Sequence, residues 1–173
     1  EESFSNLKQF LFCSTGTKVL ITSGSSTYQW SSARKTEVVD VVNGETCTDL
    51  ADFPVSNYGA LGANLDGTPI VCGGRYDSTY YQACYKLTNG GWQEFASMNE
   101  KRGYAAGIMF KNKFHVFGGY DGSSSLQTSE IISIDGAVED GPELPQAVWF
   151  HAITSINSTV SLLSGGSTSA ISY

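Results

Sequence analysis

Short apolar stretches that end in glycine recur along this chain. Three of them run into a pair of glycines, and a weaker one nearest the N-terminus ends in a single glycine. They cover residues 19–24, 70–74, 114–119 and 162–166. Their last glycines, Gly24, Gly74, Gly119 and Gly166, are 50, 45 and 47 residues apart. Repetition at such an interval is typical of stacked units, because no single unit can bury its apolar face alone. The pattern therefore predicts a repeat protein, with one glycine stretch as the second strand of each unit.

Asn-Gly and Asp-Gly dipeptides repeat with nearly the same spacing. Asn43-Gly44, Asn89-Gly90 and Asp135-Gly136 lie 46 residues apart. These dipeptides tolerate the two positive φ angles of a type I′ turn, so each predicts a two-residue hairpin. The segments before them are rich in β-branched and aromatic residues and predict the third strands, at residues 36–40, 83–87 and 129–133. The segments after them predict the fourth strands, at residues 46–53, 91–96 and 137–144.

Small-residue segments upstream of the paired glycines predict the first strand of each unit. They begin at residues 58–60, 104–106 and 150–152. Each leads to a second hairpin, at Asp66-Gly67, Lys111-Asn112 or Asn157-Ser158. No segment keeps the apolar spacing of a helix, and 19 glycines oppose long helices. The pattern therefore predicts an all-β chain with four strands in each unit.

The second unit resembles the kelch motif. Its hydrophobic run into Gly73-Gly74 is followed by Tyr85 and Trp92. The third unit keeps the glycine pair but has Ile132 and Val138 near the Tyr and Trp positions. A repeat of about 50 residues with four antiparallel strands is typical of kelch propellers. The resemblance implies an all-β, kelch-type β-propeller with about three and a half four-stranded antiparallel blades in this chain.

The implied blades cover nearly the whole chain. They are residues 8–54, 55–98 and 99–146, followed by a partial fourth blade at 147–173. The cysteines and the segments 52–54 and 141–145 are also similar to those of cysteine-containing kelch proteins of invertebrate animals. Because propellers close with about four to eight blades, we expect this chain to be part of a larger ring. Further blades of the same polypeptide, or other copies, would complete that ring.

The charge of the chain excludes some classes of partner. Ten Lys and Arg residues stand against 17 Asp and Glu residues, which gives a net charge of −7. Such a chain repels a phosphate backbone, and it has no basic stripe to offset the repulsion. Its apolar runs are far shorter than the roughly 20 residues that a membrane helix needs. We expect neither a nucleic-acid partner nor a membrane partner.

Two of the four cysteines are predicted to lie at facing strand positions. Cys72 ends a second strand and Cys84 lies in the next strand, where facing Cα atoms are about 4.5–5.5 Å apart. We predict a disulfide there, which contributes roughly 3 kcal/mol through the unfolded state. Cys13 and Cys47 belong to the first and fourth strands of the first unit, about two or three strand spacings apart. They pair through a folded-over loop, pair with a cysteine outside this chain, or remain buried free thiols.

A glycosylation signal accompanies the predicted disulfide. Asn157 begins an N-glycosylation sequon at a predicted hairpin tip, where an acceptor would be exposed. Disulfides persist in oxidising compartments. Together the two features predict a secreted, extracellular protein.

The loops that join the second and third strands carry large aromatic residues. In a kelch-like blade these loops, at residues 25–35, 75–82 and 120–128, emerge on the same face as the connections between blades. Tyr and Trp set among Ser and Gly are typical of adaptable binding loops. The candidate ligand- or partner-binding residues are Tyr28, Trp30, Arg34, Arg75, Tyr76, Tyr80, Tyr81, Arg102 and Tyr120. The alternative is that these tyrosines only pack the loops onto the blades.

No catalytic signature or metal-ligand pattern is present in the sequence. His115 occupies a strand position that is apolar in the other units, which favours a packing role, and His151 follows Phe150 on an innermost strand. Two isolated histidines do not make a metal site. We therefore expect no enzyme activity, no cofactor and no metal.

Three function classes follow from the resemblance. The favoured one is a non-enzymatic extracellular kelch propeller that binds protein or glycan, or that serves as a structural subunit of an extracellular assembly. The second is the substrate-recognition propeller of a ubiquitin-ligase adaptor that carries a BTB domain. The third is a fragment of a galactose-oxidase-like enzyme whose catalytic residues lie outside this chain. A disulfide separates the first class from the second, because cytosolic thiols stay reduced.

Overall fold

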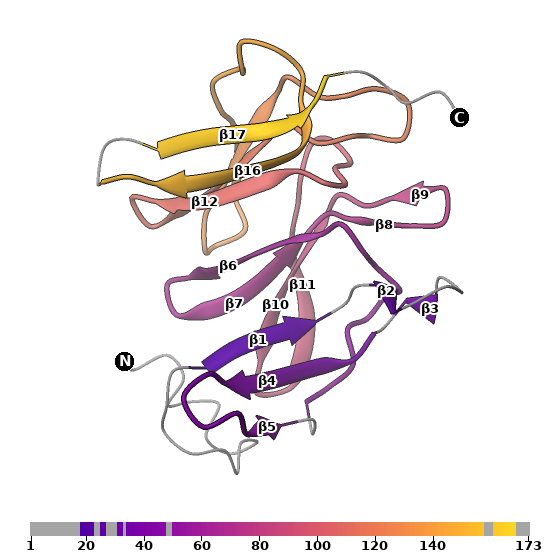
Figure 1. The fold of residues 1–173 in the computed structure, drawn as a ribbon, viewed down its shortest axis with the longest axis vertical. Helices are drawn as coiled ribbons and strands as arrows, with labels where there is room; N and C mark the ends of the chain where they lie inside the picture. The colour runs from indigo at the N-terminus through magenta and orange to yellow at the C-terminus, as the bar shows by residue number, and fades with distance from the viewer. Residues whose placement is uncertain are drawn as a thin grey trace.

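The protein is all-β, as the hydrophobic pattern predicts. A computed structural model describes residues 18–22, 25–26, 31–32, 34–47, 50–157 and 161–168. The secondary structure in these residues consists of antiparallel sheets of two to four strands, without a helix (Figure 1).

The sheet nearest the N-terminus pairs β1 (Lys18–Thr22), β4 (Thr36–Asp40) and β5 (Thr46–Cys47), with β4 in the middle. Every second residue of β4 is buried, which is the period of a strand with one covered face. A small separate hairpin, β2 (Ser25–Ser26) with β3 (Ser31–Ser32), interrupts the segment predicted as a loop at residues 25–35.

The second and third sheets each contain four strands in the same simple up-and-down order. The second consists of β6 (Leu61–Leu65), β7 (Thr68–Cys72), β10 (Ala83–Thr88) and β11 (Gly91–Ser97). The third consists of β12 (Ala106–Phe110), β13 (Lys113–Phe117), β14 (Ser129–Ile132) and β15 (Val138–Asp140). Each strand pairs with the next strand of its sheet in the chain, so the predicted four-strand units are present.

Two further pairs complete the described strands. β16 (Trp149–Ser155) pairs with β17 (Ser161–Ser167) and corresponds to the first two strands of the sheets before it. The short strands β8 (Arg75–Tyr76) and β9 (Thr79–Tyr80) form a small hairpin within the segment predicted as a loop at residues 75–82.

The turn chemistry differs from the prediction. In Asn43-Gly44 and in Asp135-Gly136 only the glycine has a positive φ angle. Neither residue of Asn89-Gly90 has one, but the next residue, Gly91, has φ 96°. A type I′ turn needs two positive φ angles, so none of these three turns is type I′. Here a glycine with left-handed backbone follows or ends the turn, as in longer hairpin loops. The type I′ pattern occurs instead at the other predicted hairpins, where Asp66-Gly67 and Lys111-Asn112 are all at positive φ.

The sheets stack with their first strands side by side. β12 lies between β6 and β16 (Figure 1). The main apolar core fills the space between the second and third sheets. Its fully buried members include Leu65, Ile70, Phe114, Val116 and Ile132. The second and third sheets therefore each cover an apolar face of the other, as in stacked repeat units.

The paired glycines are the points where consecutive sheets touch. The N–H of Gly74 donates to the carbonyl of Arg102 at 2.7 Å, and the N–H of Gly119 donates to the carbonyl of Val148 at 2.8 Å. The preceding residues, Gly73 and Gly118, have φ of +63° and +57°, and a Cβ on either would clash with the same carbonyl oxygen. Glycine at these positions therefore permits both a sharp turn and a close approach of the neighbouring backbone.

Aromatic residues join the first sheet to the second. The fully buried ring of Phe53 contacts the rings of Tyr85 and Trp92 edge-on, with centroids 5.2 Å and 5.0 Å away. The indole Nε1 of Trp92 donates to Oγ1 of Thr36 in β4 at 2.9 Å. The Tyr and Trp that mark the kelch-like unit therefore act in packing.

Cys72 and Cys84 form the predicted disulfide. They are register partners on β7 and β10, with a Cα–Cα distance of 4.1 Å and an S–S distance of 2.07 Å. Both residues are fully buried in the core.

Removing this disulfide is expected to destabilise the chain. The double variant Cys72→Ala/Cys84→Ala should lose about 2–4 kcal/mol of unfolding free energy, because the bridge restricts the unfolded chain. Urea denaturation under non-reducing conditions measures the change. Wild-type protein treated with a reductant in urea provides the control and should reach the same midpoint. Equal midpoints for the oxidised wild type and the variant would contradict the prediction.

Candidate functional site

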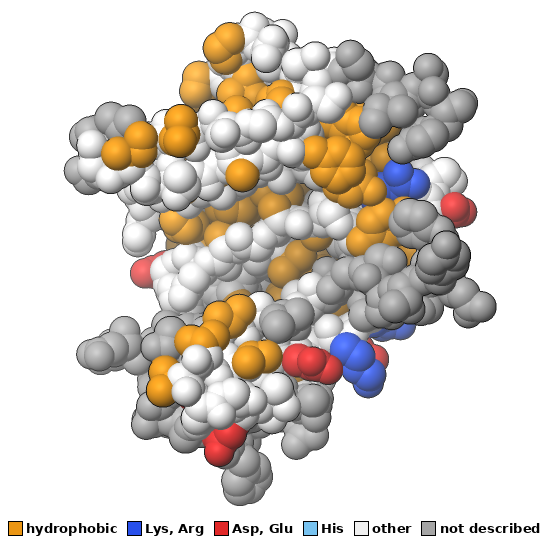
Figure 2. All heavy atoms as spheres, viewed as in Figure 1, with side chains coloured by type: hydrophobic (Ala, Val, Ile, Leu, Met, Phe, Trp, Pro, Cys, Tyr) orange, Lys and Arg blue, Asp and Glu red, His pale blue; other side chains and the backbone are white. Residues whose placement is uncertain are grey.

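An open pocket of about 900 Å³ lies where the β8–β9 hairpin meets the beginnings of the second, third and fourth units. Its lining residues are Tyr58, Arg75, Tyr76, Asp77, Ser78, Tyr80, Tyr104, Tyr120, Gly122, Trp149 and Phe150. Figure 2 shows hydrophobic side chains gathered on this side of the molecule, next to a basic side chain. Seven of the eleven lining residues are aromatic, so the pocket is a concave aromatic surface with few charges.

The repeat itself brings these residues together. Arg75 and Tyr120 follow the glycine pairs of the second and third units, 45 residues apart. Each pairs through its backbone with a residue three positions before a first strand, Arg75 with Tyr58 and Tyr120 with Gly103. Because the units share this geometry, side chains at equivalent positions converge at one end of the stack.

Arg75 is the fixed cation of the pocket. Its guanidinium carbon lies 5.4 Å from the ring centroid of Tyr58 and 4.9 Å from that of Tyr80, both within cation–π range. Nη1 donates to the Tyr80 hydroxyl at 2.8 Å, Nε donates to the carbonyl oxygen of Asp77 at 3.0 Å, and Nη2 donates to the same carbonyl. These contacts hold the guanidinium in one orientation.

The tyrosine hydroxyls around Arg75 are neutral at physiological pH. Burial raises the pKa of Tyr80 and of Tyr104, and the nearby Arg75 opposes the shift without reversing it. Both groups therefore remain protonated and keep an O–H donor beside the cation.

A chain of rings forms the opposite wall. The ring of Phe150 lies 4.1 Å from that of Tyr104 and 4.5 Å from that of Trp149, and Tyr120 lies 5.2 Å from Trp149. Tyr104 and Phe150 both have left-handed backbones, with φ of 56° and 54°. Their N–H groups donate to the carbonyls of Gly59 and Tyr104 at 2.8 Å and 3.0 Å. Bulky residues rarely adopt this backbone, and such strain often occurs at functional sites.

Four of the predicted binding residues line the pocket, namely Arg75, Tyr76, Tyr80 and Tyr120. Tyr81 does not, because its backbone is engaged by Gly74 and Arg102 in the sheet-to-sheet junction. Arg34 lies elsewhere, and its Nε donates to the carbonyl of Phe53 at 2.8 Å. Tyr28 and Trp30 lie outside the residues that the structure describes.

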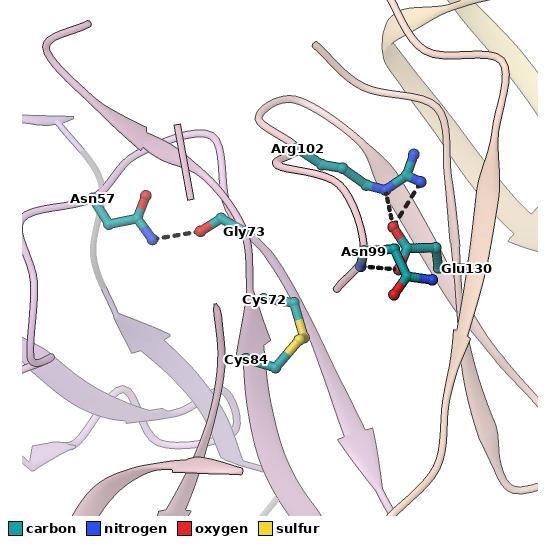
Figure 3. The surroundings of a disulfide bond; sticks show 7 residues. All are labelled: Asn57, Cys72, Gly73, Cys84, Asn99, Arg102 and Glu130. Carbon is teal, nitrogen blue, oxygen red and sulfur yellow. Dashed lines mark hydrogen bonds and ion pairs between the residues drawn. A yellow bond between two sulfur atoms is a disulfide. The ribbon is translucent and has the colours of Figure 1, made fainter. Parts of the chain in front are cut away.

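Arg102 was expected to reach the binding face, and that prediction is wrong. Its side chain is 0% exposed. Nε and Nη2 donate to Oε1 of Glu130 at 3.0 Å and 2.8 Å (Figure 3). Nη1 donates to the carbonyl of Gly118 at 2.9 Å. Asn57, 45 residues earlier, likewise donates to the carbonyl of Gly73 at 2.8 Å. The physical reason is that this repeat position faces inward to satisfy a carbonyl at the glycine turn.

Several lining residues were missed by sequence reasoning. The sequence pattern places Tyr58, Tyr104 and Phe150 at the beginnings of first strands, which is correct for Phe150 on β16, and it does not single out Trp149. β6 and β12 in fact begin later, at Leu61 and Ala106, and the residues before them form the pocket wall. The sequence did contain a signal: the repeat position that is Gly59 in the second unit is occupied by the bulky aromatic residues Tyr104 and Phe150 in the next two units.

The two histidines are packing residues in the described structure. His115 on β13 has its ring between those of Phe110 and Phe117, with centroids 5.7 Å and 6.4 Å away. His151 on β16 is buried. No group of three His, Cys, Asp or Glu residues suited to a metal ion lies within the described ranges.

The two histidines predict a pH-dependent stability. Burial lowers the pKa of His151 and of His115 below the usual 6.5, although backbone groups at Phe117 and Phe110 oppose the shifts. The unfolded chain therefore binds protons more readily, and stability present above about pH 6.5 is lost as the pH falls through the lower folded values. The urea midpoint should drop between pH 7.5 and pH 5. This drop should be smaller in the double variant His151→Gln/His115→Gln. An equal drop in the variant would show that the two histidines do not cause the loss of stability.

Other predicted features lie at the margin of the described residues. Asn157 is exposed in the turn between β16 and β17, as the sequon prediction requires, but residues 158–160 are outside the description. Cys13 and the side chain of Cys47 also fall outside it, so their pairing stays a prediction. Within the part of the chain that is described, no helix has the length and apolar character to cross a membrane.

Comparison with protein-family models and with the sequences of characterised proteins finds no match to this chain.

Proposed function

We propose that this chain is part of a kelch-type β-propeller and acts as a non-enzymatic, extracellular interaction module. The aromatic pocket beside Arg75 is the binding site, and its ligand is a protein or a glycan. The single observation that carries the proposal is the convergence of seven aromatic side chains from successive units around one fixed cation.

The sheet arrangement supports the propeller. The proposed blades at residues 55–98 and 99–146 each contain one four-stranded up-and-down sheet. The first strands of successive sheets lie side by side, and glycine pairs recur at the junctions. Radial repetition of four-stranded sheets about a common axis has these features. The first blade, residues 8–54, and the partial blade, residues 147–173, belong to the same proposal.

The disulfide supports the extracellular location. A buried Cys72–Cys84 bridge is typical of proteins that fold in an oxidising compartment, whereas a cytosolic ubiquitin-ligase adaptor would keep these thiols reduced. The exposed Asn157 is compatible with glycosylation there.

Binding screens test the proposed function. The chain would be applied to a glycan array and to a library of secreted proteins. Tyr76→Ala should bind any ligand found there about tenfold more weakly than the wild type does. The reason is that truncating an aromatic anchor commonly costs about 1–2 kcal/mol of binding free energy or more. Tyr76 is 39% exposed and lines the pocket. Ile134→Ala is the matched control, because Ile134 is 40% exposed and lies outside the pocket. Equal weakening by both variants, or no ligand in either screen, would count against the proposal.

A further inference from the structure

We infer that the pocket binds an acidic saccharide, whose carboxylate is held by Arg75 and whose sugar rings lie against the aromatic walls. This inference rests on the proposed function and specifies its ligand class.

The geometry of Arg75 favours an anionic group. A guanidinium has five N–H donors. The carbonyl of Asp77 accepts two of them and the Tyr80 hydroxyl accepts one. The Tyr104 hydroxyl is also bonded to Arg75, so one N–H remains for a ligand. Because two rings and a carbonyl already orient the group, a carboxylate oxygen meets a charged N–H donor whose direction is already fixed.

The same arrangement disfavours a cationic ligand beside Arg75. Aromatic cages bind ammonium groups by placing them over several ring faces. In this pocket Arg75 already lies over the rings of Tyr58 and Tyr80. A second cation would meet an occupied cage and a like charge.

The aromatic walls and hydroxyls favour a saccharide. Phe150 is 56% exposed and Tyr76 is 39% exposed, so each offers apolar surface to the C–H face of a sugar ring. Tyr80 and Tyr104 are neutral and keep hydroxyls for its polar edge. Asp77 also lines the pocket, and a carboxylate can accept hydrogen bonds from sugar hydroxyls.

The backbone at the site disfavours an extended peptide. Peptides added as a strand need an open sheet edge. Here Arg75 pairs with Tyr58 on one side and with Tyr80 on the other. The recognition groups that the pocket presents are therefore rings, hydroxyls and a guanidinium, which read a saccharide through its faces and edges.

Calorimetric titration with matched ligands tests the inference. The probes are oligosaccharides of galacturonic acid, of glucuronic acid and N-acetylglucosamine, and of sialyllactose type, each beside its methyl ester. The ester keeps the sugar and removes only the charge. At least one acidic probe should bind, and its ester should bind at least tenfold more weakly.

Variants of the two arginines locate the binding. Arg75→Gln should weaken the acidic probe at least tenfold, and Arg75→Lys should restore little of it, because lysine has no planar fork. Arg34→Gln is the charge-matched control outside the pocket and should bind as the wild type does. Circular dichroism and thermal melting show whether Arg75→Gln stays folded. If it does not, the ester comparison on the wild type gives the answer.

The contrary outcomes separate this inference from the proposed function. Equal binding of acid and ester would overturn the role of Arg75 but leave glycan binding in place. A poly-glutamate peptide that binds as tightly as the best sugar would overturn the saccharide assignment. A third outcome is that no acidic probe binds, while a secreted protein binds and its binding depends on Tyr76. That result would overturn the inference and leave the proposed function in place. Equal loss in Arg34→Gln would show that only net charge matters and would also overturn it.

Discussion

Replacing Arg102 by methionine should lower the free energy of unfolding by about 3–5 kcal/mol, because it leaves a buried carboxylate without its partner. Glu130 is 1% exposed and accepts two of the hydrogen bonds of Arg102. Glu130 also accepts the N–H groups of Asn99 and Glu100, at 2.6 Å and 3.2 Å, which do not neutralise its charge. The carbonyls of Gly118 and Thr128 would lose their donor as well.

Urea denaturation at neutral pH measures this change, and two controls interpret it. Arg102→Met/Glu130→Leu removes both partners and should recover part of the loss. Lys113→Met breaks the exposed Lys113–Glu139 pair and should cost no more than about 1 kcal/mol. If Arg102→Met were no worse than Lys113→Met, the buried Arg102–Glu130 pair would not be a main contribution to the stability of the third unit.

Replacing Gly73 by alanine should destabilise the chain by more than about 3 kcal/mol or prevent folding, since two costs combine. The φ of +63° costs an L-residue about 1–2 kcal/mol. The new Cβ would also collide with the Arg102 carbonyl, which accepts the N–H of Gly74, so the junction between the second and third sheets would have to open.

Gly44→Ala separates these two costs. Gly44 has a similar φ of +74°, but a Cβ there meets nothing within 4 Å. This variant should fold and lose only about 1–2 kcal/mol. Soluble yield and urea midpoints compare the variants. Equal losses at the two positions would mean that close approach contributes nothing and that backbone conformation explains the whole effect.

Much of the local structure could be predicted from the sequence. Hairpins at Asp66-Gly67 and Lys111-Asn112, the strands that flank them and the pairing of Cys72 with Cys84 depend on residues close together in the chain. A short hairpin leaves few registers in which an apolar face stays buried, so local pattern is sufficient there. The turns after the third strands were less predictable, because Asn-Gly and Asp-Gly are compatible with loops of several lengths.

The candidate site could be predicted only in part. Arg75, Tyr76, Tyr80 and Tyr120 stood out because they occupy loops after glycine pairs, and all four line the pocket. Arg102 has the same residue type as Arg75, but Glu130, 28 residues away in sequence, makes it a core residue. The environment of an arginine depends on which distant carboxylate reaches it, and composition does not contain that information.

The sequence by itself determined the period, the strands and the covalent link between β7 and β10, because glycine, β-branched residues and facing cysteines act through backbone conformation and local register. The tertiary structure decided which aromatic residues face one another. Tyr58, Tyr104 and Phe150 belong to three different units, and only the stacking of those units places them with Arg75 in one pocket. Side-chain convergence of this kind depends on the rotation between sheets, which packing over the whole interface sets.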